Sequence, residues 1–329
     1  MLYDTLCEKS EGTLVIIDEI PEVPELLNEV HRLIVERQQV FILCGSSARK
    51  LKRKGHNTLG GRALPLYLYP LVSAEIPNFD IDRAVTYGTI PSHYLSPAPS
   101  RMMAGYIDVY LKEEIKEGAL VRNLGAFQRF LEVAALTDGE IVNNNNIAQD
   151  CGVHASTVNS YFDILEDPLV GYRISAYRKV LKRKLVQAPK FYYFDVGVAN
   201  HLLHRKQLVR GTAEYGHAFE HLIIQELYAW IRYTNADEEL TYWRTYSGVE
   251  VDAVIGDARV AIEIKSAEEV HPRHLSARAE GFCRRASPKP PNSGVARPIH
   301  PPHGRCGMHL CPRVPCSALE QGAVGGIFM

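Results

Sequence analysis

Two short, unbroken apolar runs near the start of the chain constrain its fold more than any other feature. Residues 13–17 read Thr-Leu-Val-Ile-Ile, residues 40–44 read Val-Phe-Ile-Leu-Cys, and a helix-like stretch at 23–38 separates them. Continuous apolar runs of this length are typical of strands buried on both faces, as in parallel sheets that helices cover. The sequence therefore predicts a β-α-β unit in an α/β protein, whose ligands bind where the strands end.

Charged and hydroxyl residues follow both runs. Asp18 and Glu19 end the first run, and Gly45 leads into Ser46 and Ser47 after the second. This order resembles the Walker B and sensor segments of AAA-type ATPases. The resemblance implies that Asp18 holds Mg²⁺ and that Glu19 orients the attacking water. Ser46 or Ser47 would then sense the γ-phosphate of ATP. The alternative is that the two carboxylates only end a strand and cap the next helix.

The same resemblance extends to Arg62, within Gly-Gly-Arg-Ala at 60–63, which would be directed at the phosphates of ATP. The phosphate cradle of such ATPases, G-x-x-x-x-G-K-S/T, is absent from the sequence, since none of its 24 glycines is followed by lysine. The first apolar run also begins too early to leave room for that loop. We therefore expect a truncated ATPase segment, and no ATP hydrolysis by the chain as given.

A helical region follows, with a helix-turn-helix pattern at its end. Apolar residues recur at helical spacing over residues 101–138. Residues 147–151 and 156–165 are predicted to form two short helices joined at Gly152, and residues 170–177 a wing strand. The sequence therefore predicts a winged helix-turn-helix in the middle of the chain.

This motif has two interpretations. In a DNA-binding interpretation, Ser156, Thr157 and Asn159 enter a major groove, and Arg173 with the basic run at 178–184 contacts phosphates. The other interpretation is a winged-helix lid that packs on the ATPase segment. The second helix and the residues just after it contain Asp163, Glu166 and Asp167 but no Arg or Lys, which disfavours its approach to DNA.

Three carboxylates and a lysine stand out in the third region. A long amphipathic helix is predicted at 214–233, with Glu220 beside its apolar stripe. Two strands follow, at 249–255 with Asp252 and at 259–265 ending in Glu263-Ile264-Lys265. Side chains two apart in a strand share a face, so Glu263 and Lys265 are expected to point the same way.

Helix Glu, strand Asp and strand Glu-x-Lys, in this order, resemble the PD-(D/E)xK core of restriction-type nucleases. The resemblance implies that Asp252 and Glu263 bind Mg²⁺ through carboxylate oxygens. Lys265 would position or deprotonate the water, and Glu220 would support the site. Members of this superfamily also keep the fold for binding or assembly, so a non-catalytic module is the alternative.

The composition changes abruptly after residue 282. Residues 283–329 contain four of the seven cysteines, eight of the 19 prolines and none of the 17 tyrosines. With proline so frequent, neither a helix nor a paired strand can run far, so we expect a disordered or out-of-frame tail. Zinc binding is a sharper alternative, but the spacing of the candidate ligands fits no paired-knuckle pattern. Those candidates are His300, His303, Cys306, His309, Cys311 and Cys316.

Together these segments resemble one prokaryotic family over about residues 1–280, an AAA-type ATPase of unknown function with a nuclease-like C-terminal domain. The resemblance is carried by LVIIDEI, CGSSARKL, GGRALPLYLYPL, NNNNIAQDCGVHASTVNSYFDILED, KFYYFDVGVANHL, GHAFEHLIIQEL, YWRTYSGVEVDAVI and AIEIKS. The expected organisation is a partial ATPase core at 1–75, a helical lid with the winged helix-turn-helix at 76–185, the nuclease-like α/β domain at 186–282 and the tail at 283–329.

Charge and hydropathy limit the partners. The formal net charge is −1, so DNA contact is expected to be local rather than spread over the whole chain. No apolar run is long enough to span a bilayer and no secretory signal begins the sequence, which predicts a cytoplasmic protein without a membrane partner. Because AAA-type proteins often form rings, the resemblance also implies a homo-oligomer.

Overall fold

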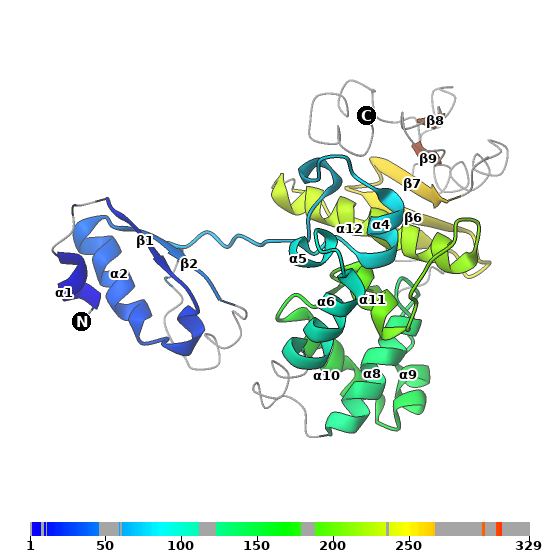
Figure 1. Cartoon of the computed structure of the whole chain (residues 1–329), viewed down its shortest axis with the longest axis horizontal. Helices are drawn as coiled ribbons and strands as arrows, with labels where there is room; N and C mark the ends of the chain where they lie inside the picture. Colours follow the sequence, from blue (N-terminus) through cyan, green and yellow to red (C-terminus); the bar gives the residue numbers. More distant parts are fainter. Residues whose placement is uncertain are drawn as a thin grey trace. The chain divides into compact units, whose positions relative to one another are not determined.

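The computed structural model describes residues 2–7, 10, 12–45, 59, 61–111, 123–178, 188–234 and 237–266, with the backbone of 298–299 and 307–310. The chain divides into two compact units (Figure 1). Unit 1 comprises Met1–Leu68 with Asp163–Val170, and unit 2 comprises Tyr69–Phe162 with Gly171–Met329. None of the described helices is long and apolar enough to cross a membrane.

Unit 1 is built on the predicted β-α-β segment. Strand β1 (Leu14–Ile17), helix α2 (Leu26–Arg37) and strand β2 (Val40–Leu43) follow one another along the chain. The strands pair in parallel, with Leu14 opposite Val40. Helix α1 (Leu2–Cys7) precedes them, and the 3-10 turn η1 (Ile20–Glu22) lies between β1 and α2. The parallel β-α-β prediction is confirmed.

Only one face of this two-stranded sheet is buried among the described residues of unit 1. Leu27 and Val30 of α2 pack in a small core that includes Ile17 and Phe41 of the strands. On the opposite face four apolar side chains are 47% to 64% exposed. These are Leu14, Ile16, Val40 and Ile42. The expected burial of both strand faces is therefore not met in the part of unit 1 that the structure describes.

The first half of unit 2 is helical. Short polar side chains start several of its helices: the Asp80 carboxylate accepts from Arg83 N at 3.1 Å, and the Asn123 side chain accepts from Ala126 N at 3.0 Å. The elements are η2 (Ser73–Glu75), α4 (Ile81–Tyr87), α5 (Pro91–Tyr94), α6 (Pro99–Gly105), the π-helical turn η3 (Tyr106–Leu111) and α8 (Leu124–Leu136).

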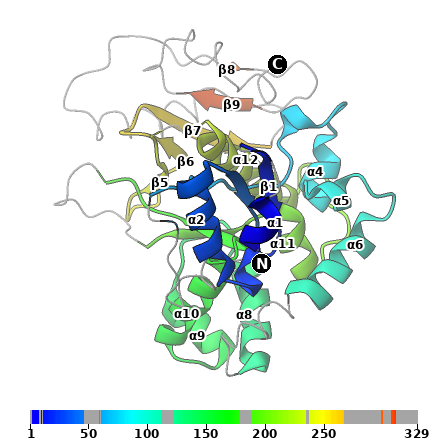
Figure 2. The same cartoon turned by 90° about the vertical axis from the view of Figure 1, so that its left-hand side faces the viewer.

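The two predicted short helices are present. Helix α9 (Asn144–Cys151) ends at Gly152, whose φ of 67° places it in the left-handed region that lets the chain turn, and α10 (Ala155–Glu166) follows. Helices α8, α9 and α10 gather together in both views, on the side of α12 away from β7 (Figures 1 and 2). Strand β3 (Gly171–Ile174), where the wing was expected, pairs antiparallel with β4 (Lys190–Tyr193).

The second half of unit 2 packs a long helix on a sheet. After α11 (Val196–Leu202) comes α12 (Ala213–Tyr233), followed by β5 (Leu240–Arg244), β6 (Glu250–Ile255) and β7 (Val260–Lys265). Helix α12 contacts β5 and β7. The three strands pair in order and antiparallel. The predicted helix-strand-strand order is therefore confirmed.

The sheet continues into two tail segments. Strand β9 (Gly307–Leu310) pairs with β7, and β8 (Pro298–Ile299) pairs with β9. In these six residues the structure has strand where disorder was expected, because the backbone of β7 offers an edge for pairing. The rest of 283–329, with most candidate zinc ligands, lies outside the described residues, and its disorder stays a prediction.

A large apolar core runs through unit 2. It joins Tyr172 and Ile174 of β3 to Phe219 and Leu222 of α12 and to Ile262 of β7. The expected border between a helical lid ending at 185 and a separate C-terminal domain therefore falls within a single compact unit, because β3 and β4, which lie on either side of it, form one sheet.

A buried carboxylate ties two segments of unit 2 together. Asp195, the N-cap of α11, accepts from Gly197 N at 2.8 Å and from Thr89 N at 2.7 Å. Burial raises the pKa of Asp195, while these two backbone donors oppose that rise. Gly88 has a φ of 75°, and a Cβ there would overlap the Asp195 carboxylate. This contact therefore requires glycine at position 88.

Two glycine substitutions separate these effects. Gly211 has a similar φ of 85°, but nothing lies near its missing Cβ. Gly211→Ala should cost about 1 kcal/mol through its backbone conformation alone. Gly88→Ala should cost at least about 3 kcal/mol, because it also displaces the Asp195 carboxylate. Urea unfolding of both variants measures the difference, and equal losses would contradict this role of Asp195.

Candidate active site on the C-terminal sheet

Helix α12 carries the first member of the candidate site. Its apolar stripe, which includes Phe219, Ile223 and Leu227, belongs to the core of unit 2. Glu220 lies beside this stripe, and its side chain is 26% exposed. Figure 2 shows α12 alongside the sheet that contains β6 and β7. The helix therefore presents Glu220 at the border between the core and solvent.

Strands β6 and β7 bring the two predicted metal ligands side by side. Ala253 pairs with Ile262, so one further step along this register sets Asp252 opposite Glu263. Residues opposite each other in an antiparallel pair share a face, so the two carboxylates lie on the same one. Asp252 is 8% exposed and Glu263 5%. The amide of Ile264 donates to Asp252 Oδ2 at 2.7 Å.

Lys265 is the most exposed member of this group. Its Nζ lies 2.8 Å from Glu263 Oε1 and 3.8 Å from Asp252 Oδ2, and its side chain is 39% exposed. The structure thus brings together Asp252, Glu263 and Lys265, as the sequence predicted. The ammonium group stands where the two buried carboxylates meet solvent.

A second lysine that sequence reasoning missed joins the cluster from β4. Lys190 is 4% exposed, and its Nζ lies 2.6 Å from Glu250 Oε1 and 3.5 Å from Glu220 Oε1. Glu250 Oε2 is also 3.1 Å from Arg244 Nη1. Lys190 comes between Pro189 and an aromatic run in the sequence, where no local pattern marks it. Only the fold shows that it faces α12 and β6.

The electrostatics follow from burying carboxylates together. Burial raises the pKa of Asp252 to about 7, helped by the charges of Glu220 and Glu263 and opposed by Lys265 and the Ile264 amide. Burial favours the neutral amine of Lys190, but the carboxylates of Glu220 and Glu250 outweigh this effect and raise its pKa. In Lys265, too, neighbouring carboxylates overcome burial and raise the pKa. Both lysines are therefore cations at neutral pH.

The donor set fits a hard divalent cation in a limited way. Among the described residues no group of three or more His, Cys, Asp or Glu side chains is arranged to hold a metal ion. Mg²⁺, however, is commonly held by one or two carboxylates, with water and substrate phosphate completing its shell. Asp252 and Glu263 supply two such carboxylates, and their mutual repulsion favours a cation between them. The expected ligand pair is therefore chemically suitable for Mg²⁺.

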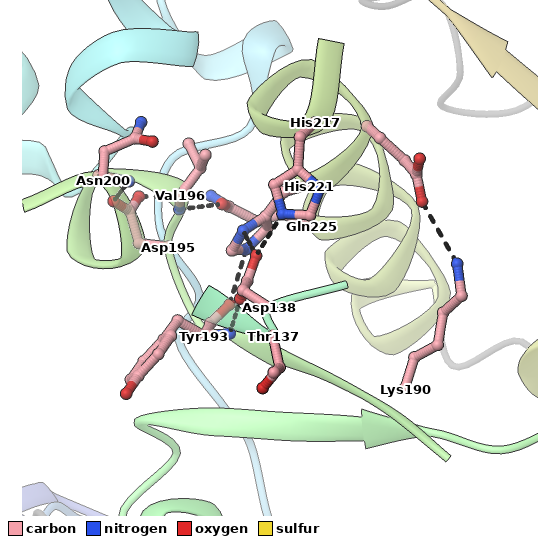
Figure 3. Close-up of polar contacts among 12 residues, drawn as sticks. Thr137, Asp138, Lys190, Tyr193, Asp195, Val196, Asn200, His217, His221 and Gln225 are labelled. Atoms are coloured by element: carbon pink, nitrogen blue, oxygen red, sulfur yellow. Dashed lines mark hydrogen bonds and ion pairs between the residues drawn. The ribbon is translucent and has the colours of Figure 1, made fainter. Parts of the chain in front are cut away.

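A separate buried ion pair lies on another face of α12 (Figure 3). His221 Nδ1 is 2.7 Å from Asp138 Oδ2, and His221 Nε2 lies 2.8 Å from the carbonyl oxygen of Tyr193. Asp138 also accepts from Tyr193 N at 2.9 Å. Burial opposes protonation of His221, but Asp138 more than offsets it and raises the histidine pKa. Because both ring nitrogens face acceptors, these contacts favour the protonated ring, and His221 joins α12 to β4 and to the turn after α8.

The residues predicted for nucleotide binding lie in unit 1. Asp18 and Glu19 follow β1 directly and are exposed, and Asp18 Oδ1 accepts from Glu19 N at 3.0 Å. Glu19 is in the left-handed region, with a φ of 51°. Arg62 is exposed, and its amide donates to Leu59 O at 2.9 Å. Ser46 and Ser47 lie outside the described residues, so their predicted roles stay predictions.

The predicted DNA-contacting residues are arranged as follows. Ser156 and Asn159 of α10 are exposed and Thr157 is partly buried. Asn159 Oδ1 accepts from Asn144 Nδ2 of α9 at 2.8 Å. Of the basic run at 178–184, Arg178 is described and exposed, and the rest lies outside the described residues. DNA contact through these residues stays a prediction.

Comparisons with known proteins support the coarse organisation of the chain. Residues 2–76 match the family described as an AAA domain. The N-terminal segment is AAA-like. Residues 78–208 and 215–295 match two families, each described as a domain of unknown function, DUF8612 and DUF4143. The chain thus combines an AAA-type ATPase-like segment with a region of unknown function. That region contains the carboxylate cluster, which is formed by Glu220, Glu250, Asp252 and Glu263.

One relative matches at low identity. It is a protein of Haemophilus influenzae described as uncharacterized, 23% identical over 246 residues, which cover 69% of this chain and 60% of the relative. The AAA-like chain therefore spans well under the full length of that relative. No solved structure matches the chain.

The pKa of Asp252 predicts how stability depends on pH. Its folded value of about 7 is above the ordinary 3.8, so the folded state binds this proton more tightly. The stability that this tighter proton binding provides is fully present below pH 3.8 and is lost as the pH rises through 7. Between pH 4 and pH 8, in a metal-free buffer, the wild type should therefore lose stability relative to Asp252→Asn, by on the order of 3 kcal/mol.

Chemical unfolding at several pH values measures this difference. The matched control is Asp237→Asn, which changes an exposed carboxylate of the same unit. The control should follow the wild type across the whole range. A parallel pH dependence in Asp252→Asn and the wild type would show that Asp252 is not forced to ionise against its surroundings.

Proposed function

We propose that the C-terminal part of this AAA-like protein hydrolyses phosphodiester bonds with Mg²⁺ bound to Asp252 and Glu263. The observation that carries the proposal is the pair of buried, adjacent carboxylates with the ammonium group of Lys265 at 2.8 Å from Glu263. Carboxylates that repel one another in a buried place are costly unless a cation lies between them. Lys265 supplies one cation, and Mg²⁺ would supply another.

The chain's own residues have distinct tasks in this reaction. Bound Mg²⁺ would polarise a phosphoryl oxygen and lower the pKa of a coordinated water. Lys265, the most exposed member, donates hydrogen bonds to a non-bridging phosphate oxygen or to the attacking water. Because its pKa is raised, it acts as a donor and not as a base at neutral pH. Glu220 supports the site from α12.

The overall reaction is a hydrolysis. Water adds to phosphorus, the ester P–O bond breaks, and the products are a phosphate monoester and a hydroxyl group. DNA is the proposed substrate, and the helix-turn-helix of α9 and α10 with the basic run at 178–184 is the proposed contact. The AAA-like segment keeps Asp18 and Glu19 but lacks the phosphate loop, so the proposed cytoplasmic activity depends on Mg²⁺ and not on ATP hydrolysis by this chain.

A second candidate function rests on a specific observation. Lys190 and Lys265 already stand between the carboxylates and neutralise much of their charge. Carboxylates that are neutralised by neighbouring lysines stabilise a fold without binding a metal ion and without catalysing a reaction. In this alternative the C-terminal part is a non-catalytic module for binding DNA or assembling with other proteins, including copies of itself.

Cleavage assays on the full chain distinguish the two functions. Asp252→Ala and Lys265→Ala should each lower Mg²⁺-dependent cleavage of DNA by about a hundredfold or more. The controls Asp237→Ala and Lys206→Ala, which change exposed residues of the same unit, should cleave as the wild type does. Cleavage that persists in both site variants, or that does not depend on Mg²⁺, would overturn the enzymatic proposal.

A further inference from the structure

The two lysines contact different members of the carboxylate cluster. Lys265 contacts Glu263, whereas Lys190 contacts Glu250 and Glu220. Glu250 and Asp252 are two apart on β6 and therefore share a face of the sheet. One lysine thus stands at the proposed metal ligands, and the other stands next to them, between strand β6 and helix α12.

Lys190 is built into this place firmly. Its backbone pairs with Ile174 of β3 and bridges to Ile141, and its side chain is 4% exposed. Glu250, which anchors its ammonium group at 2.6 Å, is itself held by Arg244. A buried lysine is tolerated only when it is paired in this way. Its ammonium group also lies 3.5 Å from the carboxylate of Glu220 and 5.5 Å from the centre of the Tyr242 ring.

Glu220 is the carboxylate that this contact affects. It belongs to α12, not to the sheet, so its position is set by its own rotamer and by its partner. After burial itself, its negative charge is the strongest influence on the pKa of Asp252. Without Lys190, Glu220 would lose this ion pair and would be free to turn toward a cation bound at Asp252, as a further carboxylate ligand.

We infer that Lys190 is a positioning residue, which holds Glu220 in an ion pair and so limits the cation site to the two carboxylates of Asp252 and Glu263. The inference rests on the proposed function. A two-carboxylate site leaves several coordination positions of Mg²⁺ for water and phosphate, as a hydrolytic site needs. A third carboxylate would bind the ion more tightly and leave fewer of these positions open.

Calorimetric titration of the full chain with MgCl₂, without nucleic acid, tests the inference. Lys190→Met should bind Mg²⁺ about tenfold more tightly than the wild type, which corresponds to about 1.4 kcal/mol. Glu220→Gln should bind Mg²⁺ more weakly by no more than about threefold, because it removes a nearby negative charge but no ligand while Lys190 is present. In the double variant, which combines Lys190→Met with Glu220→Gln, most of the gain in Mg²⁺ affinity should be lost, because residue 220 is then no longer a carboxylate.

The outcomes are separable. An unchanged or weaker affinity in Lys190→Met, the same gain with and without Glu220, or a tenfold loss in Glu220→Gln would each overturn the inference. Lys190→Gln keeps a donor to Glu250 and is the second variant if Lys190→Met does not fold. If neither folds, Glu220→Gln, which retains the buried lysine, still tests the inference, because a tenfold loss of Mg²⁺ affinity would show that Glu220 is a ligand.

A different result would contradict the proposed function itself. If Asp252→Asn binds Mg²⁺ as tightly as the wild type, the cation site is not at Asp252 and Glu263. Cleavage rates of the same variants give a second comparison. Lys190→Met should cleave more slowly despite its tighter binding, and this opposite movement would not follow from a purely structural lysine.

Discussion

The architecture around the candidate site depends on pairing charges that are hidden from water. Glu220, Glu250, Asp252 and Glu263 come from one helix and two strands, and a fold that gathers them must supply cations at the same place. Lys190 arrives from β4 and Lys265 from β7. Burial, together with the charges of Glu220 and Glu263, raises the pKa of Asp252. Three cations, the two lysines and the Arg244 guanidinium beside Glu250, still leave an excess of negative charge among the four carboxylates. A divalent cation is the chemical species that would remove it.

Buried polar groups are also paired along the rest of α12. Several polar side chains that this helix buries contact other elements of unit 2, among them His221 and Gln225 (Figure 3). His221 meets Asp138, Gln225 donates to Thr89 at 3.0 Å, and Glu226 accepts from Ser73 N at 2.8 Å. Burial raises the pKa of Glu226 to about 7, which the two Ser73 donors counteract. Helix α12 therefore fixes the position of several segments far apart in the sequence, and the candidate site is built on it.

The sequence predicted what local patterns encode. Apolar periodicity located α12, β6 and β7 within a few residues, and two-residue spacing predicted that Glu263 and Lys265 share a face. The parallel pairing of β1 and β2 followed from their unbroken apolar runs. Contacts between segments that are distant in the sequence could not be predicted from local patterns. Lys190 and Asp138 carry no local signal, and their partners lie at least 30 residues away along the chain, so only the packing of β4 and α12 reveals them.

The central claim is that the pair formed by Asp252 and Glu263 binds a divalent cation. The most direct test is the effect of Mg²⁺ on thermal unfolding of the full chain, since a ligand that binds only the folded state stabilises it, by about 2.7 kcal/mol at a hundredfold excess over its Kd. Mg²⁺ should raise the Tm of the wild type and of Glu239→Gln, a control that changes an exposed carboxylate, but not of Asp252→Asn or Glu263→Gln. An equal rise in all four proteins, or none in the wild type, would contradict it.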